Sequence, residues 1–287
     1  MKAMLLATLA LCANLFAADF VKKGGDYVYR DTLVFDESSV NLTSVACESI
    51  NGETKITGSD RNSVHVTVYV EIKCDDLEEG QKYLKSFRPV VAREDARLRI
   101  YGEYPDGSWS WNEISANMDF VIEAPAGLNL DASSANGEIV CVGMTGAADL
   151  ECANGEISFL SETGTTGSIS ASCANGEIDV DVAKLNGSSS FECANGEIDV
   201  VVHQLLAANI DASTANGEIT IALPENSSMR IVARSLVNGS IESDWAGVHD
   251  KGLIGDNYEL VVNDGKYKID CSSANGEITI RKSNLAN

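Results

Sequence analysis

Histidine, closely spaced cysteine pairs and positive charge are all scarce in this chain, and each shortage argues against a class of function. The three histidines, His65, His203 and His249, do not have the spacing of metal ligands. No Cys-x-x-Cys pair occurs, which argues against a zinc or thiol-redox site. Lys and Arg number 21 against 43 Asp and Glu, so the net charge is −22. That charge argues against nucleic acid or an anionic membrane surface as a partner.

Motifs of common enzyme classes are missing as well. The sequence has no G-x-S-x-G, no phosphate-binding loop and no dinucleotide fingerprint. His65 and His203 lie in strand-like stretches and are expected to be packed or surface residues. Because 44% of the residues are apolar, the chain has enough material for a core, and its acidity does not indicate disorder. We therefore expect a folded protein that is not an enzyme.

One phrase, Ala-Asn-Gly-Glu-Ile, recurs through the chain. Complete copies stand at Ala135–Ile139, Ala153–Ile157, Ala174–Ile178, Ala194–Ile198, Ala215–Ile219 and Ala274–Ile278. Degenerate copies contain Asn51-Gly52 and Asn238-Gly239. From Asn136 to Asn238 the copies follow one another every 18 to 22 residues. A nearly fixed period of this size is the signature of a repeat architecture.

Within each repeat, apolar and polar residues alternate before the Asn and again after the Gly, which predicts a strand, a turn and a second strand. Asn-Gly supplies two residues that tolerate positive φ. The third residue after each Asn is Ile in every complete copy and is expected to face inward, as is the second residue before it. That second column contains Ser134, Cys152, Cys173, Cys193, Thr214, Leu236 and Ser273.

Two architectures fit this pattern. In a parallel β-solenoid each repeat is one coil and the Asn-Gly is a corner, so Cys152 stacks on Cys173 and Ile178 on Ile198. In the other, Asn-Gly closes an antiparallel hairpin that sets Cys152 opposite Ile157. Near-identical phrases favour the solenoid, because every coil must present the same edge to the next. We predict an all-β protein with a right-handed β-helix-like solenoid of about 20 residues per coil, although the residues leave the hand open.

The chain divides into three predicted parts. Residues 1–18 have a basic start, an apolar core and a small-residue cleavage site, as a secretory signal peptide does. A lipid anchor at Cys12 is disfavoured, because Leu11 precedes the cysteine where a small residue is needed. Residues 19–127 are expected to form a cap of strands, with the first repeat and a helix over Asp75–Phe87. No other segment is apolar enough to span a bilayer.

Residues 128–287 are expected to form the repeat array. Glycine and asparagine mark residues 246–266 as a loop-rich insertion, with a hairpin expected between Tyr258–Val262 and Lys266–Ile269. Ser273–Ile280 is expected to be the last repeat and to close the stack. Seven cysteines follow the signal segment. Cys152, Cys173 and Cys193 share a column, where burial as small apolar residues and disulfide formation are both open, as is a Cys47–Cys74 pair.

Two features are candidate binding sites. One is the outward column Glu138, Glu156, Glu177, Glu197 and Glu218, which predicts either a solvated row or a row that collects Ca²⁺ or a basic partner. No other cofactor is expected. The second is the turn with Trp109 and Trp111, whose side chains point to one side of an extended segment. They form either an end cap or, near Tyr101 or Tyr104, a platform for sugar rings.

The Asn-Gly-Glu-Ile phrases, the stretch Val64–Ile72 and the lead-in Val121–Gly127 together resemble a bacterial family of exported β-strand repeat proteins, labelled putative adhesins or a domain of unknown function. The resemblance covers most of residues 30–282 and implies a β-helix-like fold without catalytic residues. The expected function is that of a non-enzymatic structural or adhesin-like protein in the periplasm or at the cell surface, whose unknown partner is a protein or glycan of the envelope. The alternative is a carbohydrate-active enzyme on a β-helix.

Overall fold

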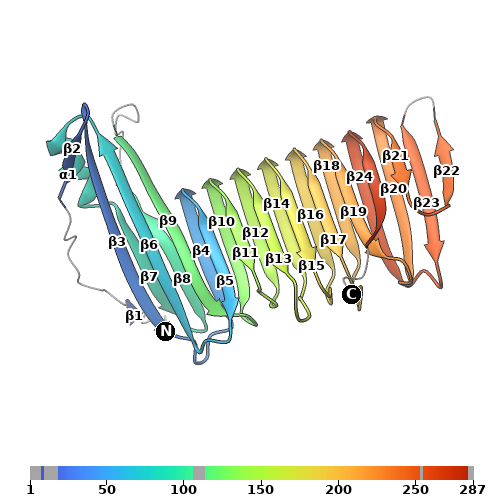
Figure 1. Ribbon diagram of the computed structural model, residues 1–287, viewed down its shortest axis with the longest axis horizontal. Coiled ribbons are helices and arrows are strands. Elements are labelled where there is room, and N and C mark those ends of the chain that lie inside the picture. Colours follow the sequence, from blue (N-terminus) through green and yellow to red (C-terminus); the bar gives the residue numbers. More distant parts are fainter. Residues whose placement is uncertain (1–7, 10–18, 106–113, 253–254, 284–287) are drawn as a thin grey trace, which may run out of the picture.

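The computed structural model describes residues 8–9, 19–105, 114–252 and 255–283. These residues form two long β-sheets that face each other and one short helix, α1 (Leu77–Leu84) (Figure 1). Sheet A contains, in spatial order, β1 (Thr8–Leu9), β7 (Arg88–Glu94), β8 (Arg97–Glu103), β4 (Ser44–Asn51), β10 (Asn129–Asn136), β12 (Ala148–Asn154), β14 (Ile169–Asn175), β16 (Ser189–Asn195), β18 (Ile210–Asn216), β24 (Tyr267–Asn275), β20 (Met229–Asn238), β23 (Asp256–Val262) and β22 (Val248–Lys251). Sheet B contains β2 (Val21–Lys23), β3 (Asp26–Ser38), β6 (Ser63–Cys74), β9 (Ile114–Pro125), β5 (Thr54–Ser59), β11 (Ile139–Val142), β13 (Ile157–Ser161), β15 (Ile178–Val182), β17 (Ile198–Val202), β19 (Ile219–Pro224), β25 (Ile278–Ser283) and β21 (Ile241–Ser243).

Each repeat contributes one strand to each sheet, and the Asn-Gly stands at the corner between them. Neighbouring repeats pair in parallel, with Cys152 beside Cys173 in sheet A and Ile178 beside Ile198 in sheet B. Both pairings confirm the solenoid prediction. The antiparallel hairpin is wrong, because the strands on either side of each corner, such as β12 and β13, lie in different sheets.

The core is the narrow space between the two sheets. The isoleucine that follows each complete corner is at most 1% exposed, as its inward position predicts. Bulky and small residues alternate along one inward column of sheet A, which contains Leu150, Ala171, Phe191 and Ala212. Phe191, for example, is fully buried and stacks between Ala171 and Ala212 in sheet A. This alternation lets adjacent coils interdigitate at the density of a normal protein interior.

The order of the coils differs from the order of the repeats at the C-terminal end. The last repeat does not close the stack. Its strands β24 and β25 lie between β18/β19 on one side and β20/β21 on the other (Figure 1). The chain thus leaves β19, skips one position to build β20 and β21, and returns to fill the gap. The prediction that Ser273–Ile280 ends the stack was wrong because the repeated phrase fits either neighbour equally well.

Two further details at this end correct the sequence prediction. Leu236 is 55% exposed, because the register shifts between Ser235 and Asn238 and places Ser235 in the inward column. The expected hairpin within the insertion does not form. Instead, β23 pairs antiparallel with β20 and β22, while β24 pairs in parallel with β18 and β20. Strand β20 therefore lies between the two segments that were expected to pair.

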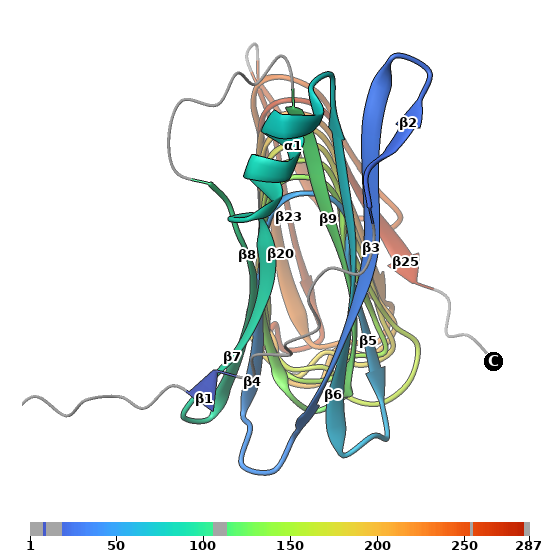
Figure 2. The same cartoon turned by 90° about the vertical axis from the view of Figure 1, so that its left-hand side faces the viewer.

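The N-terminal end is built by a similar detour. Strands β4 and β5 stack directly on β10 and β11, although 85 residues separate the two corner asparagines Asn51 and Asn136. The chain between them adds β6 and β7, which run antiparallel to their neighbours, and then β8 and β9, which form a coil outside β4 and β5. Figure 2 shows α1 between the two sheets at this end.

Helix α1 is shorter than the segment expected over Asp75–Phe87. It begins after Asp76, whose carboxylate accepts a hydrogen bond from the backbone N–H of Glu79 at 3.0 Å, as an N-cap does. The expected buried face is present, since Tyr83 and Phe87 are buried. Gly80 allows the close approach to β6, because a Cβ there would lie 2.4 Å from the Sγ of Cys74.

Among the described residues, no helix has the length and apolar character needed to cross a membrane. Residues 1–7 and 10–18 lie outside the described residues, so the signal peptide and the role of Cys12 stay predictions. So does the division into 19–127 and 128–287. Both sheets continue across that boundary through the pairing of β4 with β10 and of β5 with β11.

Candidate functional site

The corner asparagines form a continuous ladder of side-chain hydrogen bonds. In each coil the Nδ2 of the asparagine donates to the Oδ1 of the asparagine in the preceding coil, at 3.0–3.2 Å. In spatial order the ladder comprises Asn51, Asn136, Asn154, Asn175, Asn195, Asn216, Asn275 and Asn238. The role of the corner asparagine is therefore to form side-chain hydrogen bonds with the asparagines of the neighbouring coils.

Only glycine fits after each ladder asparagine, because a Cβ would clash with the preceding coil and because the backbone φ is positive. Its φ lies between +120° and +159°, a region that side chains disfavour. A Cβ on Gly176 would lie 1.7 Å from the carbonyl oxygen of Gly155. The ladder asparagines are absent from the residues with positive φ, which include only Asn41 and Asn263 among the described asparagines. Of the two corner residues that tolerate positive φ, only the glycine therefore adopts it.

The cysteine column lies immediately inside this corner. The thiols of Cys152, Cys173 and Cys193 donate to glycine carbonyls of the preceding coil at 3.2–3.4 Å, and Thr214 and Ser273 donate in the same way through hydroxyls. All seven described cysteines are buried and unpaired, Cys47 and Cys74 included. Burial raises the pKa of each thiol in the column, which lowers its reactivity.

The glutamate column runs along the outside of the corner, half-buried at Glu138 and Glu156 and exposed at Glu177, Glu197 and Glu218. A shallow groove follows the first four of these glutamates. Partial burial, reinforced by the neighbouring glutamates, raises the pKa of Glu138 and Glu177. Within the described ranges, no group of three or more His, Cys, Asp or Glu has the geometry to hold a metal ion. Ca²⁺ binding by this column stays a prediction.

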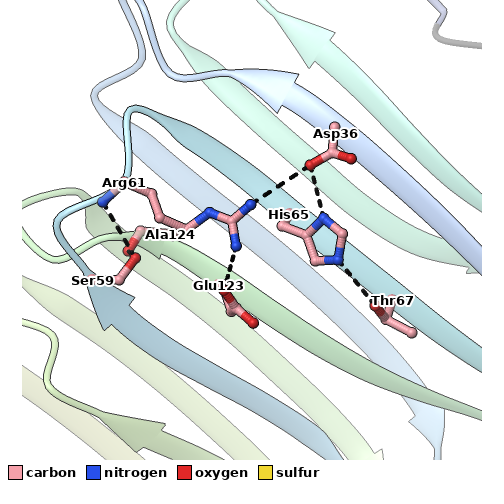
Figure 3. Close-up of polar contacts among 7 residues, drawn as sticks. All are labelled: Asp36, Ser59, Arg61, His65, Thr67, Glu123 and Ala124. Carbon is pink, nitrogen blue, oxygen red and sulfur yellow. Dashed lines mark hydrogen bonds and ion pairs between the residues drawn. The ribbon is translucent and has the colours of Figure 1, made fainter.

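A second polar cluster lies on the outer face of sheet B, near its N-terminal edge (Figure 3). Asp36 of β3 contacts the Nδ1 of His65 of β6 at 2.7 Å. The other ring nitrogen of His65 is 3.5 Å from the hydroxyl of Thr67. Arg61 bridges Asp36 and Glu123 of β9. The cluster thus connects three adjacent strands of sheet B, namely β3, β6 and β9.

Asp36, His65 and Thr67 follow one another as the acid, histidine and hydroxyl of a nucleophilic triad do. Their geometry, however, suits a structural role better. The distance of 3.5 Å from Thr67 to His65 exceeds the reach of an activating hydrogen bond, about 2.6–3.2 Å. Asp36 is 61% exposed, so the cluster lies open to solvent. His203 likewise contacts Asp181 on the outer face of the array, at 2.9 Å. Both histidines are partly exposed surface residues, as expected, and each contacts a carboxylate.

A partly enclosed hollow lies at the N-terminal end of the asparagine ladder. We call it the head pocket. Its volume is about 550 Å³. One wall is the end of β4, another is α1, and the others are β6, the chain after β8 and the start of β9. The lining includes Ile50, Asn51, Tyr83, Tyr104, Ile114 and Glu71.

Trp109 and Trp111, the predicted sugar platform, lie outside the described residues. The two tyrosines expected near them point in different directions. Tyr104 faces the head pocket, and burial raises its pKa to about 12. Tyr101 lies on β8, with the guanidinium of Arg99 over its ring at 4.7 Å. Sequence reasoning missed the head pocket, because its walls are brought together by pairings between residues far apart in the chain.

Comparison with known proteins gives similarity at the level of the family. No curated protein matches the chain. A putative adhesin from Bacteroides fragilis NCTC 9343 is 11% identical, with 87% of this chain and 97% of that chain covered and a TM-score of 0.42. A putative cell adhesion protein from Clostridium sporogenes ATCC 15579 is 9% identical, with 88% of this chain and 100% of that chain covered and a TM-score of 0.37. A putative lipid binding protein from Parabacteroides distasonis ATCC 8503 is 12% identical, with 89% of this chain and 97% of that chain covered and a TM-score of 0.36.

A family model covers most of the chain. The model described as Toastrack DUF4097 matches residues 31–244, which include the first repeat, most of the N-terminal cap and the array up to β21. The predicted resemblance to a family of unknown function labelled putative adhesin is confirmed. The chain belongs to the Toastrack DUF4097 family.

Proposed function

We propose that this protein is an exported, non-enzymatic scaffold that binds a protein or glycan of the cell envelope, in the manner of an adhesin. The asparagine ladder is the observation that carries the proposal. Its seven hydrogen bonds hold the exposed corner in one register over eight coils. Identical groups recur there about every 4.8 Å. Such a row suits an extended or repetitive partner, because several weak contacts then act together.

The finer features of the proposal follow the sequence. The leader over residues 1–18 directs the chain to the periplasm or the cell surface, and an anchor at Cys12 is the less favoured route. The array is a right-handed, β-helix-like rod of about 20 residues per coil. Its acidic surface favours partners that are neutral or basic.

Capture from the native envelope tests the proposal. The corner variant replaces Glu156, Glu177 and Glu197 by Gln. The control replaces the exposed Asp149 by Asn, and Glu151 and Glu192 by Gln, removing the same charge from the outer face of sheet A. We expect a discrete partner to be retained by the wild type and the control and to be lost with the corner variant. Equal capture by all three would show that the corner is not the binding surface.

A screen against polysaccharides checks the non-enzymatic part. We expect no new reducing ends and no unsaturated products. Robust turnover that is abolished by one carboxylate substitution would replace the scaffold by a carbohydrate-active enzyme.

The glutamate column is proposed to collect Ca²⁺ weakly. Titration with CaCl₂ should give a heat signal and a rise in melting temperature beyond that of NaCl at equal ionic strength. Replacement of Glu138, Glu156, Glu177, Glu197 and Glu218 by Gln should abolish both. If the calcium and sodium salts give the same response, the column is a solvated row.

The tryptophan turn is proposed as a second contact with the partner. Replacement of Trp109 and Trp111 by Ala should reduce capture while the melting temperature stays unchanged. A large fall in melting temperature would instead show that these side chains belong to the packed end of the solenoid.

A further inference from the structure

We infer that the head pocket binds a single neutral sugar ring. This inference rests on the proposed binding function and specifies where a glycan partner is held. The pocket lies at the one end of the asparagine ladder that α1 and β9 enclose, and its volume of about 550 Å³ is typical of small-molecule sites, which occupy about 300–1,000 Å³.

The apolar walls of the pocket are fixed by packing behind them. Tyr104 packs edge-on against Phe87, with 5.1 Å between the ring centroids, and Phe87 packs against Tyr83 at 5.3 Å. Ile50 and Ile114 add aliphatic surface, and Ile50 is 43% exposed. Aromatic faces carry a partial negative charge that attracts C–H groups. These walls therefore suit the C–H face of a ring that also carries hydroxyls.

The ladder supplies a hydrogen-bond donor at the pocket. The Oδ1 of Asn51 accepts from Asn136 at 3.1 Å, and this contact fixes the orientation of the Asn51 amide. In every later coil the Nδ2 donates to the preceding asparagine, but Asn51 is the first in the ladder and its Nδ2 has no partner asparagine among the described residues. A ligand at Asn51 must therefore present an acceptor oxygen, as a sugar hydroxyl does.

The charge of the pocket selects a neutral ligand. Glu71 is the one charged side chain among the described lining residues, and Arg30 forms an ion pair with it. Since this described lining includes no cationic group, a carboxylate or phosphate would lose its hydration without gaining a counter-charge. A cationic ligand would meet only Glu71, whose charge Arg30 already neutralises. A neutral, hydroxylated ring satisfies both conditions.

Saturation-transfer NMR with the full chain tests the inference. The probes are glucose, galactose and N-acetylglucosamine, with glucuronic acid as the anionic comparison and choline as the cationic one. We expect at least one neutral sugar to bind with a dissociation constant in the millimolar range, and at least tenfold more tightly than either charged probe. Binding of none of the neutral sugars, or preference for a charged probe, would overturn the inference.

Matched variants locate the binding. Ile50→Thr removes aliphatic surface from the pocket rim, and Leu236→Thr makes a comparable change at an exposed position on the opposite end of the stack. Loss of buried CH₂ surface should weaken sugar binding about fourfold for Ile50→Thr, with no change for Leu236→Thr. Asn51→Asp keeps the acceptor for Asn136, removes the donor and should weaken binding about tenfold.

Equal effects of Ile50→Thr and Leu236→Thr, with melting temperatures unchanged, would place the sugar elsewhere and overturn the inference. The outcome is separable from that of the scaffold proposal. Capture of an envelope partner that persists in Ile50→Thr and Asn51→Asp, without sugar binding by the wild type, would leave the scaffold in place and refute the pocket. Sugar binding by the wild type without capture of any envelope partner would support the pocket and refute the scaffold.

Discussion

The middle of the solenoid and its two ends are built on different principles. In the middle, each coil pairs with the copies on either side through the same corner, and Asn175 both donates and accepts within the ladder. At the ends the chain leaves this order. The coil of β8 and β9 is inserted at one end and that of β24 and β25 at the other. Local repetition therefore sets the register of the coils, while contacts between distant segments set their order.

At the C-terminal end, where no further coil follows, a side chain supplies a hydrogen-bond acceptor that the next coil supplies elsewhere. There, the backbone N–H of Ile241 donates to the carboxylate of Asp256 at 3.2 Å. In the array the equivalent N–H of Ile178 donates to the carbonyl oxygen of Glu197 at 2.9 Å. Asp256 is 4% exposed and also contacts His249 at 2.7 Å. It thus stands in for the next coil and blunts an edge that would otherwise extend.

The largest expected effect comes from breaking the corner in the middle. Gly176→Ala forces a Cβ into the carbonyl oxygen of Gly155 at a φ of +148°. Strain and overpacking should lower the free energy of unfolding by about 3–5 kcal/mol, measured by urea denaturation. Gly127→Ala is the control, because a Cβ there meets nothing within 4 Å. Similar losses in the two variants would contradict this explanation of the corner glycines.

The next effect concerns the C-terminal end. Asp256→Ala leaves the N–H of Ile241 buried without an acceptor and should cost about 2–3 kcal/mol of unfolding free energy. Hydrogen exchange should then accelerate at β21 and β20 while the array stays protected. The exposed neighbouring substitution Asn257→Ala should have little effect. Uniform acceleration over all coils would show that Asp256 is not a local cap.

A smaller effect compares positions along the ladder. Asn175→Ala removes two ladder hydrogen bonds, whereas Asn238→Ala removes one. We expect losses of about 1–2 kcal/mol for Asn175→Ala and about half of that for Asn238→Ala, because partly exposed hydrogen bonds contribute modestly. Thermal unfolding of both variants gives the ratio. A loss at Asn238 equal to or larger than that at Asn175 would argue against the ladder as a chain of equivalent bonds.

The smallest effect is a difference in pH dependence between the array and the N-terminal end. In the array, burial raises the pKa of Glu138, Glu177, Asp179 and Asp199. The folded array binds protons more readily than the unfolded chain, so its stability should rise as the pH falls from neutral toward about 4. Replacing Glu177 by Gln and Asp199 by Asn should flatten this rise.

At the N-terminal end the sign is reversed. Hydrogen bonding to Lys73 lowers the pKa of Asp26, and hydrogen bonding to Arg99 lowers that of Glu48. These groups contribute stability above the usual carboxyl pKa of about 4, and it is lost as the pH falls through their lowered values. Hydrogen exchange corrected for intrinsic rates should therefore show the array tightening down to about pH 4.5 and the N-terminal strands loosening below about pH 4. The same trend in both regions would contradict the assignment.

The sequence was sufficient for whatever depends on a single repeat. Alternation identified the buried isoleucines, and the identical phrases predicted the stacking of Cys152 on Cys173. It was insufficient where one phrase has two equivalent partners, since the corner at Asn275 fits beside Asn216 and beside Asn238 alike. Leu236 was misplaced because a register shift leaves no mark on the alternation. The walls of the head pocket come from five separate segments, and no local pattern connects them.

The order of the coils is the central claim, and methyl NOE spectroscopy of Ile-labelled protein tests it without any substitution. In the structure Ile219 pairs with Ile278, and Ile278 pairs with Ile241. We expect strong NOEs between the methyl groups of Ile219 and Ile278 and between those of Ile278 and Ile241, and none between Ile219 and Ile241. A strong NOE between Ile219 and Ile241 would show that the repeats stack in chain order and would contradict the inserted last coil.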